Sequence, residues 1–234
     1  MPIKTKAQME QIFLFAFTVK SVIIGAVTNF EGGRAVGKIG VFGGSFNPIH
    51  RGHLAMATYA VCAFALERML LLPTGNPPHK HEGLADKLDR MEMVRLAARE
   101  DPRFEACDLE ITREGVIYTV DTLRALKRSL PEAELYYLIG ADTLLDLHTW
   151  RRIEEVLSLC RFIVCGRPGY RQKEVISCME SMRQSGAGMY WLDMPAVDIS
   201  ATMVRAMAAE KRPLEGVVTA PVAAYIQSRG LYGA

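Results

Sequence analysis

The sequence lacks the features that mark a secreted, zinc-binding or membrane-spanning chain. Its five cysteines are odd in number and form no Cys-x-x-Cys pair, which argues against a disulfide framework and against a structural metal site. No apolar run approaches the ~20 residues that cross a bilayer. The formal net charge is only +2, which does not indicate a nucleic-acid surface. We therefore expect reduced thiols, a cytoplasmic location, and neither nucleic acid nor membrane as a partner.

The first 37 residues differ in character from the rest of the chain. They hold two apolar stretches, residues 12–19 and 21–27, which Lys20 separates. Val36 lies two residues before the first predicted strand, where a start codon would be expected. Our hypothesis is that residues 1–37 are a poorly ordered or non-native extension and that residues 38–234 form the one folded domain. Mass spectrometry of the protein made from its own gene tests this, and a native peptide from residues 1–35 would contradict it.

From residue 38 onward, apolar runs alternate with segments of helical spacing. In addition to Ile39, Val41 and Phe42, five short runs are expected to be buried strands: residues 69–73, 104–107, 135–139, 162–165 and 189–192. Helical spacing appears in residues 87–100, where Leu88, Met91, Val94 and Ala98 share one face, and in residues 120–130 and 150–159. This alternation predicts an α/β fold with a doubly wound parallel sheet, whose ligands bind beyond the carboxyl ends of the strands.

The most informative segment is residues 38–53, a short strand that runs through two glycines into a pair of histidines. We expect Gly43 and Gly44 to let the backbone turn sharply and approach a ligand closely. His50, Gly52 and His53 would then open the next helix, where free N–H groups and the helix dipole attract anions. Residues three apart share a helix face, so both histidines are expected to point at one polyphosphate. No Gly-x-Gly-x-x-Gly pattern follows the strand, so this is not a dinucleotide fingerprint.

Residues 198–205 indicate a second phosphate-binding segment. Ser200 is a candidate helix N-cap, Thr202 lies on the first turn, and Arg205 follows one turn later. Hydroxyls, helix-start N–H groups and a guanidinium suit the two phosphates that leave as pyrophosphate. An ordinary capped helix with a surface arginine is the alternative interpretation.

A Pro- and Gly-rich segment, residues 72–80, is expected to be an ordered loop after the second strand. It would present His79 and Lys80 to the same cleft. A solvated loop with stray charges is the alternative.

Together these motifs resemble those of the nucleotidyltransferase superfamily, whose signature is His-x-Gly-His. The chain carries it as residues 50–53, behind Gly43 to Pro48. Residues 199–205 are similar to the Ile-Ser-Ser-Thr-x-Ile-Arg segment of its adenylyltransferases, with Ala201 in place of the second serine and Val204 in place of isoleucine. The missing hydroxyl puts one hydrogen bond in doubt.

Further motifs resemble those of the nicotinate mononucleotide adenylyltransferase family. They follow the family's order from about Lys38 to Tyr232: residues 77–80, 118–123, 140–144, Trp150 and residues 167–169. The resemblance implies a Rossmann-like nucleotidyltransferase fold and a single catalytic domain over residues 38–234. Trp150 and Tyr118 would offer ring faces to a pyridine, and donors near Thr119 would meet its carboxylate, although core packing is a competing explanation for both aromatic residues. Asp142, after a strand, suits ribose hydroxyls or the adenine side.

The resemblance implies that the chain transfers AMP from ATP to nicotinate mononucleotide, giving deamido-NAD and pyrophosphate, with Mg²⁺ carried by ATP and no metal-binding side chains. The implied catalytic residues are His50, His53 and Arg205. The implied ATP-binding residues are Gly43, Gly44, Ser45, Phe46, Gly52, Gly140, Asp142, Ser200 and Thr202. The implied nicotinate mononucleotide-binding residues are Asn47, His79, Lys80, Tyr118, Thr119 and Trp150.

Three alternatives stay open from the sequence. The acceptor is nicotinamide mononucleotide or phosphopantetheine in two of them, and in the third the chain is a regulator that binds nucleotide without turnover. The intact His50, His53 and Arg205 speak against the third, since a degenerate site would be expected to lose one of them. The oligomeric state cannot be predicted from these residues.

Overall fold

The computed structural model describes residues 37–75, 83–166 and 172–234. Residues 37–234 belong to one compact unit. The extension proposed for residues 1–37 lies outside the described residues except for Gly37, and its native or non-native origin stays a prediction.

Six strands form one sheet in the order β3-β2-β1-β4-β5-β6, and every neighbouring pair is parallel. Their bounds are β1 Lys38–Gly44, β2 Arg68–Pro73, β3 Phe104–Ala106, β4 Glu134–Gly140, β5 Arg161–Cys165 and β6 Met189–Leu192. The predicted strands are all present. The five that were predicted as ranges have bounds that differ by at most one residue, and β1 extends two residues further than predicted, through Gly43 and Gly44. The doubly wound α/β fold is therefore confirmed.

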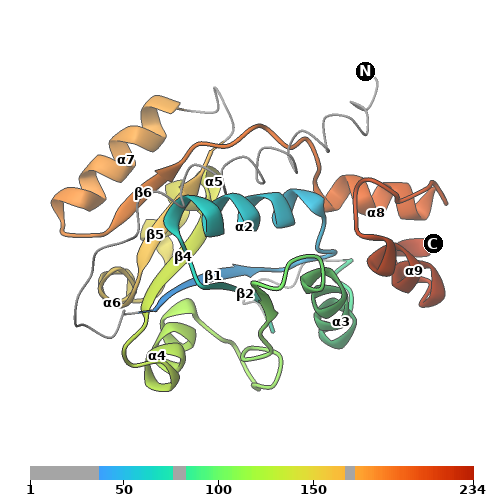
Figure 1. Ribbon diagram of the computed structural model, residues 1–234, viewed down its shortest axis with the longest axis horizontal. Coiled ribbons are helices and arrows are strands. Elements are labelled where there is room, and N and C mark those ends of the chain that lie inside the picture. Colours follow the sequence, from blue (N-terminus) through green and yellow to red (C-terminus); the bar gives the residue numbers. More distant parts are fainter. Residues whose placement is uncertain (1–36, 76–82, 167–171) are drawn as a thin grey trace. The chain divides into compact units, whose positions relative to one another are not determined.

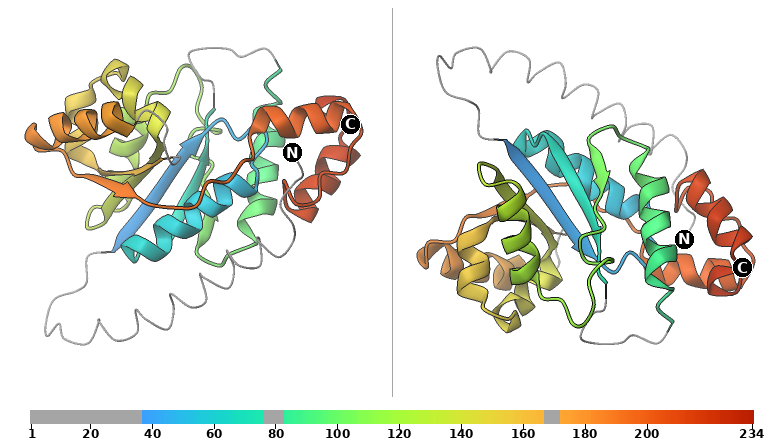
Figure 2. Two further views of the ribbon diagram at one scale, coloured as in Figure 1. Left: turned by 90° about the horizontal axis from the view of Figure 1, so that it is seen from above. Right: turned by 90° about the horizontal axis from the view of Figure 1, so that it is seen from below.

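Helices cover both faces of this sheet, and α2 and α4 lie on opposite sides of β1 (Figures 1 and 2). The helices are α2 Arg51–Phe64, α3 Lys87–Ala98, α4 Thr119–Ser129, α5 Ala141–Asp146, α6 Ile153–Leu159, α7 Gln172–Gln184, α8 Ala201–Ala209 and α9 Ala220–Ser228, with short 3₁₀ turns η1 Leu147–Thr149 and η2 Leu231–Gly233. Within this described part, no helix is long and apolar enough to cross a membrane.

The two faces of the sheet build two separate cores. Alternate residues of β1 show the division: Phe42 packs with residues of α2, α3, α8 and α9, whereas Ile39 and Val41 pack with residues of α4, α5, α6 and α7. Successive side chains of a strand point to opposite faces, so a strand buried on both sides needs a nearly continuous apolar run.

The order in which successive strands are added to the sheet reverses between β1 and β4. The next two strands in sequence, β2 and β3, lie on one side of β1, and β4, β5 and β6 lie on the other. Ligands of doubly wound sheets bind at this switch point, beyond the carboxyl ends of the two strands. Here the loop and helix start after β1, residues 45–53, and the start of α5 after β4 occupy that position.

Two details of the predicted helices are wrong. Leu88 does not share the buried face of α3 but is 64% exposed, and Arg90 is buried in the same helix. The helix predicted over residues 150–159 begins only at Ile153, because Arg152 adopts a left-handed conformation with φ 55° between η1 and α6.

Candidate functional site

The two histidines lie at the N-terminus of α2, where the sequence predicted them. His50 is the N-cap residue in an extended conformation, and His53 lies in the first turn. The backbone N–H of His50 donates to Nδ1 of His53 at 3.2 Å. Because Nδ1 accepts this bond, the neutral ring carries its proton on Nε2. His53 is therefore fixed as a hydrogen-bond donor through Nε2.

The imidazoles of His50 and His53 stack on each other, with ring centroids 3.6 Å apart and an angle of 24° between the planes. Phe46 and Phe42 meet the His53 ring edge to face, at centroid distances of 5.1 and 5.8 Å. This environment, through desolvation first and the charge of His50 second, holds the pKa of His53 well below its ordinary value. His53 is thus neutral at physiological pH in the free protein.

The lowered pKa of His53 predicts that acid weakens the fold. The unfolded chain protonates this histidine near pH 6.5 while the folded chain does not. The unfolded state therefore binds more protons, and the free energy of unfolding falls as the pH drops from about 6.5 toward the folded pKa. We expect His53→Asn to flatten this dependence in urea titrations between pH 7.5 and 5.5. An equal flattening by His148→Asn, at an exposed histidine, would contradict the assignment to His53.

The loop between β1 and α2, residues 45–50, is called the phosphate loop below, after its proposed role. Its sharp turn is made by Phe46 and not by the two glycines. Gly43 and Gly44 are the last residues of β1, and neither lies in the left-handed region, whereas Phe46 does, with φ 43°. The Phe46 side chain is 1% exposed and packs on Phe42 and His53. Burial of this large ring stabilises a backbone conformation that a phenylalanine rarely adopts. The expectation that the glycines make the turn is therefore wrong.

Gly43 is needed for a different reason, which is the close approach of Tyr137 from β4. A Cβ atom at residue 43 would overlap the Tyr137 hydroxyl. That hydroxyl shares a hydrogen bond with the side chain of Thr119 at the start of α4, and the Tyr137 side chain is buried. The glycine thus lets β1, β4 and α4 meet at one point beside the loop.

Gly43→Ala is expected to lower the free energy of unfolding by about 1–3 kcal/mol, because the added methyl must displace a buried hydroxyl. Urea unfolding measures the loss. Tyr137→Phe removes the oxygen that the methyl meets, so the double variant should recover part of the loss seen in Gly43→Ala. Simple additivity of the two changes would show that this contact is not the cause.

The C-terminal motif, residues 198–205, lies against the phosphate loop. Ser200 is the N-cap of α8 and accepts a bond from the backbone N–H of Met203 at 3.1 Å. One Arg205 nitrogen donates to the backbone carbonyl of Asn47 at 2.9 Å, and another donates to the Thr202 hydroxyl at 3.2 Å. The structure therefore brings the two predicted phosphate motifs together.

Gly52 allows this close approach. A Cβ atom there would lie 3.0 Å from the His50 ring and 3.3 Å from the carbonyl oxygen of Ile199, the residue that precedes Ser200. Both distances are shorter than ordinary contact. The glycine of the His-x-Gly-His motif thus serves the packing of α2 against the second motif.

The polar residues predicted to bind ATP lie on accessible surface. Ser45, Asp142, Ser200 and Thr202 are exposed. Asp142 lies in the first turn of α5, and Gly140 is its N-cap residue at the end of β4. These positions follow β1, β4 and β6, and the first two strands flank the switch point.

The residues predicted to hold the nicotinate ring come together around β4. Trp150 meets Tyr137 edge to face at 5.8 Å between ring centroids, and the same Tyr137 hydroxyl bonds Thr119. Tyr118 is the N-cap residue of α4, and the guanidinium of Arg151 lies 4.5 Å above its ring. Tyr118, Thr119 and Trp150 are all half-buried, so each keeps a part of its surface available.

Two predicted residues, His79 and Lys80, lie outside the described residues, as does the Arg-Pro-Gly motif at residues 167–169. Asn47, predicted to bind nicotinate mononucleotide, is 7% exposed. Its side chain bonds to the backbone of Gly83 and Ala85 at 3.0 Å each. The loop after β1 is therefore tied to the segment that leads into α3.

A buried arginine that the sequence analysis missed ties together three of the surrounding loops. Arg90 is 1% exposed and donates to the carbonyls of Ser45 at 2.8 Å, Ala85 at 3.1 Å and Gly75 at 3.2 Å. Glu110 is also buried, and the sequence analysis missed it as well. Its carboxyl group accepts a hydrogen bond from the backbone N–H of the same Gly75. Desolvation raises the pKa of the Glu110 carboxyl.

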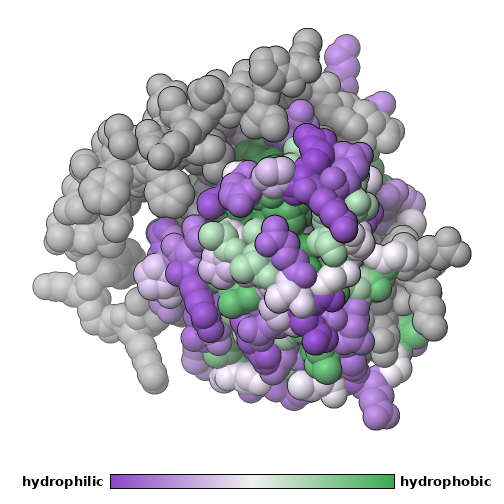
Figure 3. Space-filling view, turned by 90° about the vertical axis from the view of Figure 1, so that its right-hand side faces the viewer, coloured by the Kyte–Doolittle hydropathy of each residue, from purple (hydrophilic) through white to green (hydrophobic). Residues whose placement is uncertain are grey.

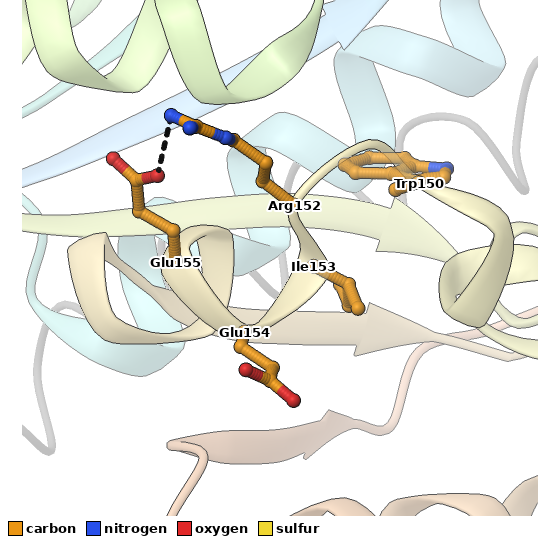
Figure 4. Close-up of a pocket in the computed structure, with 5 residues that line it drawn as sticks. All are labelled: Trp150, Arg152, Ile153, Glu154 and Glu155. Carbon is orange, nitrogen blue, oxygen red and sulfur yellow. Dashed lines mark hydrogen bonds and ion pairs between the residues drawn. The ribbon is translucent and has the colours of Figure 1, made fainter.

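A shallow hollow opens beside α6. It is lined by Trp150, Arg152, Ile153, Glu154 and Glu155, and Arg152 reaches Glu155 at 3.4 Å (Figure 4). Glu155 also accepts two bonds from Arg124, at 2.6 and 2.7 Å. Trp150 is the one residue of the predicted site that lines this hollow, so we place the candidate site at the two motifs. Over the described ranges, no group of three His, Cys, Asp or Glu side chains could hold a metal ion.

Comparison with known proteins identifies the family of this chain. The family model described as cytidylyltransferase-like matches residues 41–207. A protein of Desulfitobacterium hafniense (strain Y51), named "Probable nicotinate-nucleotide adenylyltransferase", is 41% identical over 197 residues, which cover 83% of this chain and 95% of the relative. A protein of the same name from Moorella thermoacetica is 37% identical over 199 residues, covering 84% and 92%.

Solved structures share the fold. The nicotinic acid mononucleotide adenylyltransferase of Plasmodium falciparum, complexed with NaAD, superposes with a TM-score of 0.69 at 18% identity, over 84% of this chain and 97% of that one. The Vibrio parahaemolyticus structure described as a putative nicotinate-nucleotide adenylyltransferase has a TM-score of 0.60, also at 18% identity, and covers 84% and 96%. At this identity the likeness concerns the fold.

Proposed function

This chain belongs to the cytidylyltransferase-like family, among its nicotinate-nucleotide adenylyltransferases, and from this premise we propose that it transfers AMP from ATP to nicotinate mononucleotide. The products are deamido-NAD and pyrophosphate, and the reaction is a step of NAD synthesis. The observation that carries the proposal is the meeting of the two phosphate motifs, through the bond from Arg205 to the Asn47 carbonyl and the contact of Gly52 with Ile199.

The reaction needs alignment more than it needs a protein nucleophile. A phosphate oxygen of nicotinate mononucleotide attacks the α-phosphorus of ATP, and the bond from that phosphorus to the β-bridging oxygen breaks. The acceptor phosphate is already an anion, so no strong general base is required. The protein's contribution is to hold both substrates in line and to stabilise charge on the α-phosphate and on the leaving pyrophosphate.

The described residues suit these tasks. His53 offers an Nε2 proton at the N-terminus of α2, where the helix dipole also favours an anion. Arg205, with the hydroxyls of Ser200 and Thr202, would hold the β- and γ-phosphates. Asp142 would accept bonds from the ribose hydroxyls. Mg²⁺ enters with the triphosphate as part of the substrate.

The acceptor would lie on the side of β4. Trp150 and Tyr118 would pack on the pyridine ring, and Thr119, held by Tyr137, would donate to its carboxylate. We also place the reaction in the cytoplasm, which the five free cysteines support.

The test is pyrophosphate release with Mg-ATP and, in separate reactions, nicotinate mononucleotide, nicotinamide mononucleotide or phosphopantetheine, with products identified by mass. We expect strong preference for the nicotinate acceptor. Pyrophosphate release with only one of the other two acceptors would still support the roles of the two phosphate motifs. It would contradict the roles of Tyr118, Thr119 and Trp150. Binding of ATP without release in any reaction would favour a nucleotide-binding regulator.

A further inference from the structure

Asn47 is the point at which four distant segments of the chain meet. Its side-chain oxygen accepts the Ala85 N–H at 3.0 Å and the Tyr232 hydroxyl at 2.8 Å, and its amide donates to the Gly83 carbonyl at 3.0 Å. Its backbone carbonyl accepts the Arg205 guanidinium at 2.9 Å. Asn47 lies three residues before His50, so its position sets the path of the chain into α2.

Tyr232 belongs to none of the motifs that the function uses. It lies in η2, which packs against α8, the helix that carries Arg205, and its backbone is left-handed with φ 61°. Figure 3 shows the side of the domain on which α8 and α9 lie, where hydrophilic residues surround a central group of hydrophobic ones. The Tyr232 side chain is half-buried.

The Tyr232 hydroxyl lies near Arg205 of the predicted phosphate site and near the buried Arg90. Arg205 and Arg90 are both close enough to act electrostatically on it, and desolvation outweighs them, so the pKa of Tyr232 is raised. The hydroxyl therefore stays protonated and keeps donating. Asn47 Oδ1 has two lone pairs, and the Ala85 N–H and this hydroxyl are the two donors that fill them.

We propose that Tyr232 is a positioning residue for nucleotidyl transfer, which holds the Asn47 side chain so that the Asn47 carbonyl keeps Arg205 against the loop that leads into His50. Tyr232 acts through Asn47 and does not itself touch the substrates. The proposal rests on the function proposed above, because it assigns Arg205 to the triphosphate. Tyr232 thus links the segment after α9 to the centre of the reaction.

The chain offers a matched control. Tyr225, in α9, donates its hydroxyl to Asp89 at 2.8 Å. Tyr225→Phe and Tyr232→Phe each remove one oxygen from a hydrogen bond that docks the same C-terminal segment. Only the second change reaches Asn47. We expect similar shifts of the urea midpoint in both variants.

Kinetics then separate the two variants. Tyr232→Phe should lower kcat by about tenfold and leave KM for ATP and nicotinate mononucleotide within about twofold, since a loosely held Arg205 loses transition-state contacts rather than ground-state binding. Tyr225→Phe should keep the wild-type kcat. Adding Tyr232→Phe to Asn47→Ala should cause no further loss, because the partner is already gone. Equal losses of kcat in both tyrosine variants, no loss in Tyr232→Phe, or an additive loss in the Asn47→Ala background would each overturn the proposal.

A readout without substrate separates this proposal from the proposed function. The side-chain amide signal of Asn47 in NMR spectra should shift in Tyr232→Phe and stay in place in Tyr225→Phe. A wild-type protein that releases no pyrophosphate would refute the proposed function, and with it the kinetic role of Tyr232. An active wild-type protein whose Asn47 signal is the same in both variants would refute the positioning role alone.

Discussion

Replacing His53 with alanine is expected to lower kcat by at least ~10²–10³, the usual cost of removing one donor from a site that stabilises developing negative charge. Nδ1 of His53 is occupied by the backbone N–H of His50, so Nε2–H is the group left to face an anion. Its ring is neutral in the free protein, which makes it a donor without the desolvation cost of a buried cation. Initial rates of pyrophosphate release under saturating substrates measure the loss.

The loss must be separated from damage to the fold. His53 lies against Phe42 and Phe46, so its removal also leaves a gap in packing. Circular dichroism and urea unfolding should show that His53→Ala remains folded at the assay temperature. His148→Ala, at an exposed histidine on η1, is the control and should keep wild-type turnover. If His53→Ala stays within about tenfold of the wild type, the histidine does not stabilise the transferred phosphate.

Arg90→Met should have the largest effect on stability, a loss of about 3–5 kcal/mol in the free energy of unfolding. Methionine keeps much of the apolar stem of the side chain but none of its donors. Three backbone carbonyls, those of Ser45, Gly75 and Ala85, would lose their partners in a buried region. The Glu110 carboxyl would lose a nearby positive charge as well.

The matched control for Arg90→Met lies on the same helix. Arg95 is 50% exposed and forms ion pairs with Glu92 and Asp108 at 3.6 and 3.7 Å. Exposed pairs contribute little, so Arg95→Met should cost no more than about 1 kcal/mol. Arg90→Lys should fall between the two, because one ammonium cannot reach three carbonyls in a planar arrangement. Equal losses in Arg90→Met and Arg95→Met would mean that the buried bonds contribute nothing measurable.

Local pattern was enough to predict the sheet and the two helix starts at which the proposed phosphate motifs lie. The strands are short, continuous apolar runs, and the fold class follows from their alternation with helices. Ser200 was recognisable as an N-cap because its side chain and position in sequence satisfy a local rule.

The residues that the sequence did not reveal act over long separations. Tyr137 limits residue 43 to glycine from a neighbouring strand, and Tyr232 bonds a residue 185 positions away. Arg90 had a usable signal: it precedes Met93, Val94 and Ala97 at spacings of three, four and seven, which places it on the buried stripe of α3. The left-handed Phe46 had none, because its conformation is stabilised by the packing of its ring.

The convergence on Asn47 also bears on how the protein is made. The contacts at this residue close loops of 36, 38, 158 and 185 residues. Contacts between residues that are far apart in the sequence form late in folding. The chain loses conformational entropy when it closes a long loop, and only afterwards does the new contact stabilise the fold. A growing chain can therefore complete β1, β2 and α3 early, while the reaction centre is finished only after Tyr232 has been synthesised. We expect a chain released before this residue to lack the bond that holds the Asn47 side chain, and therefore to have a lowered kcat.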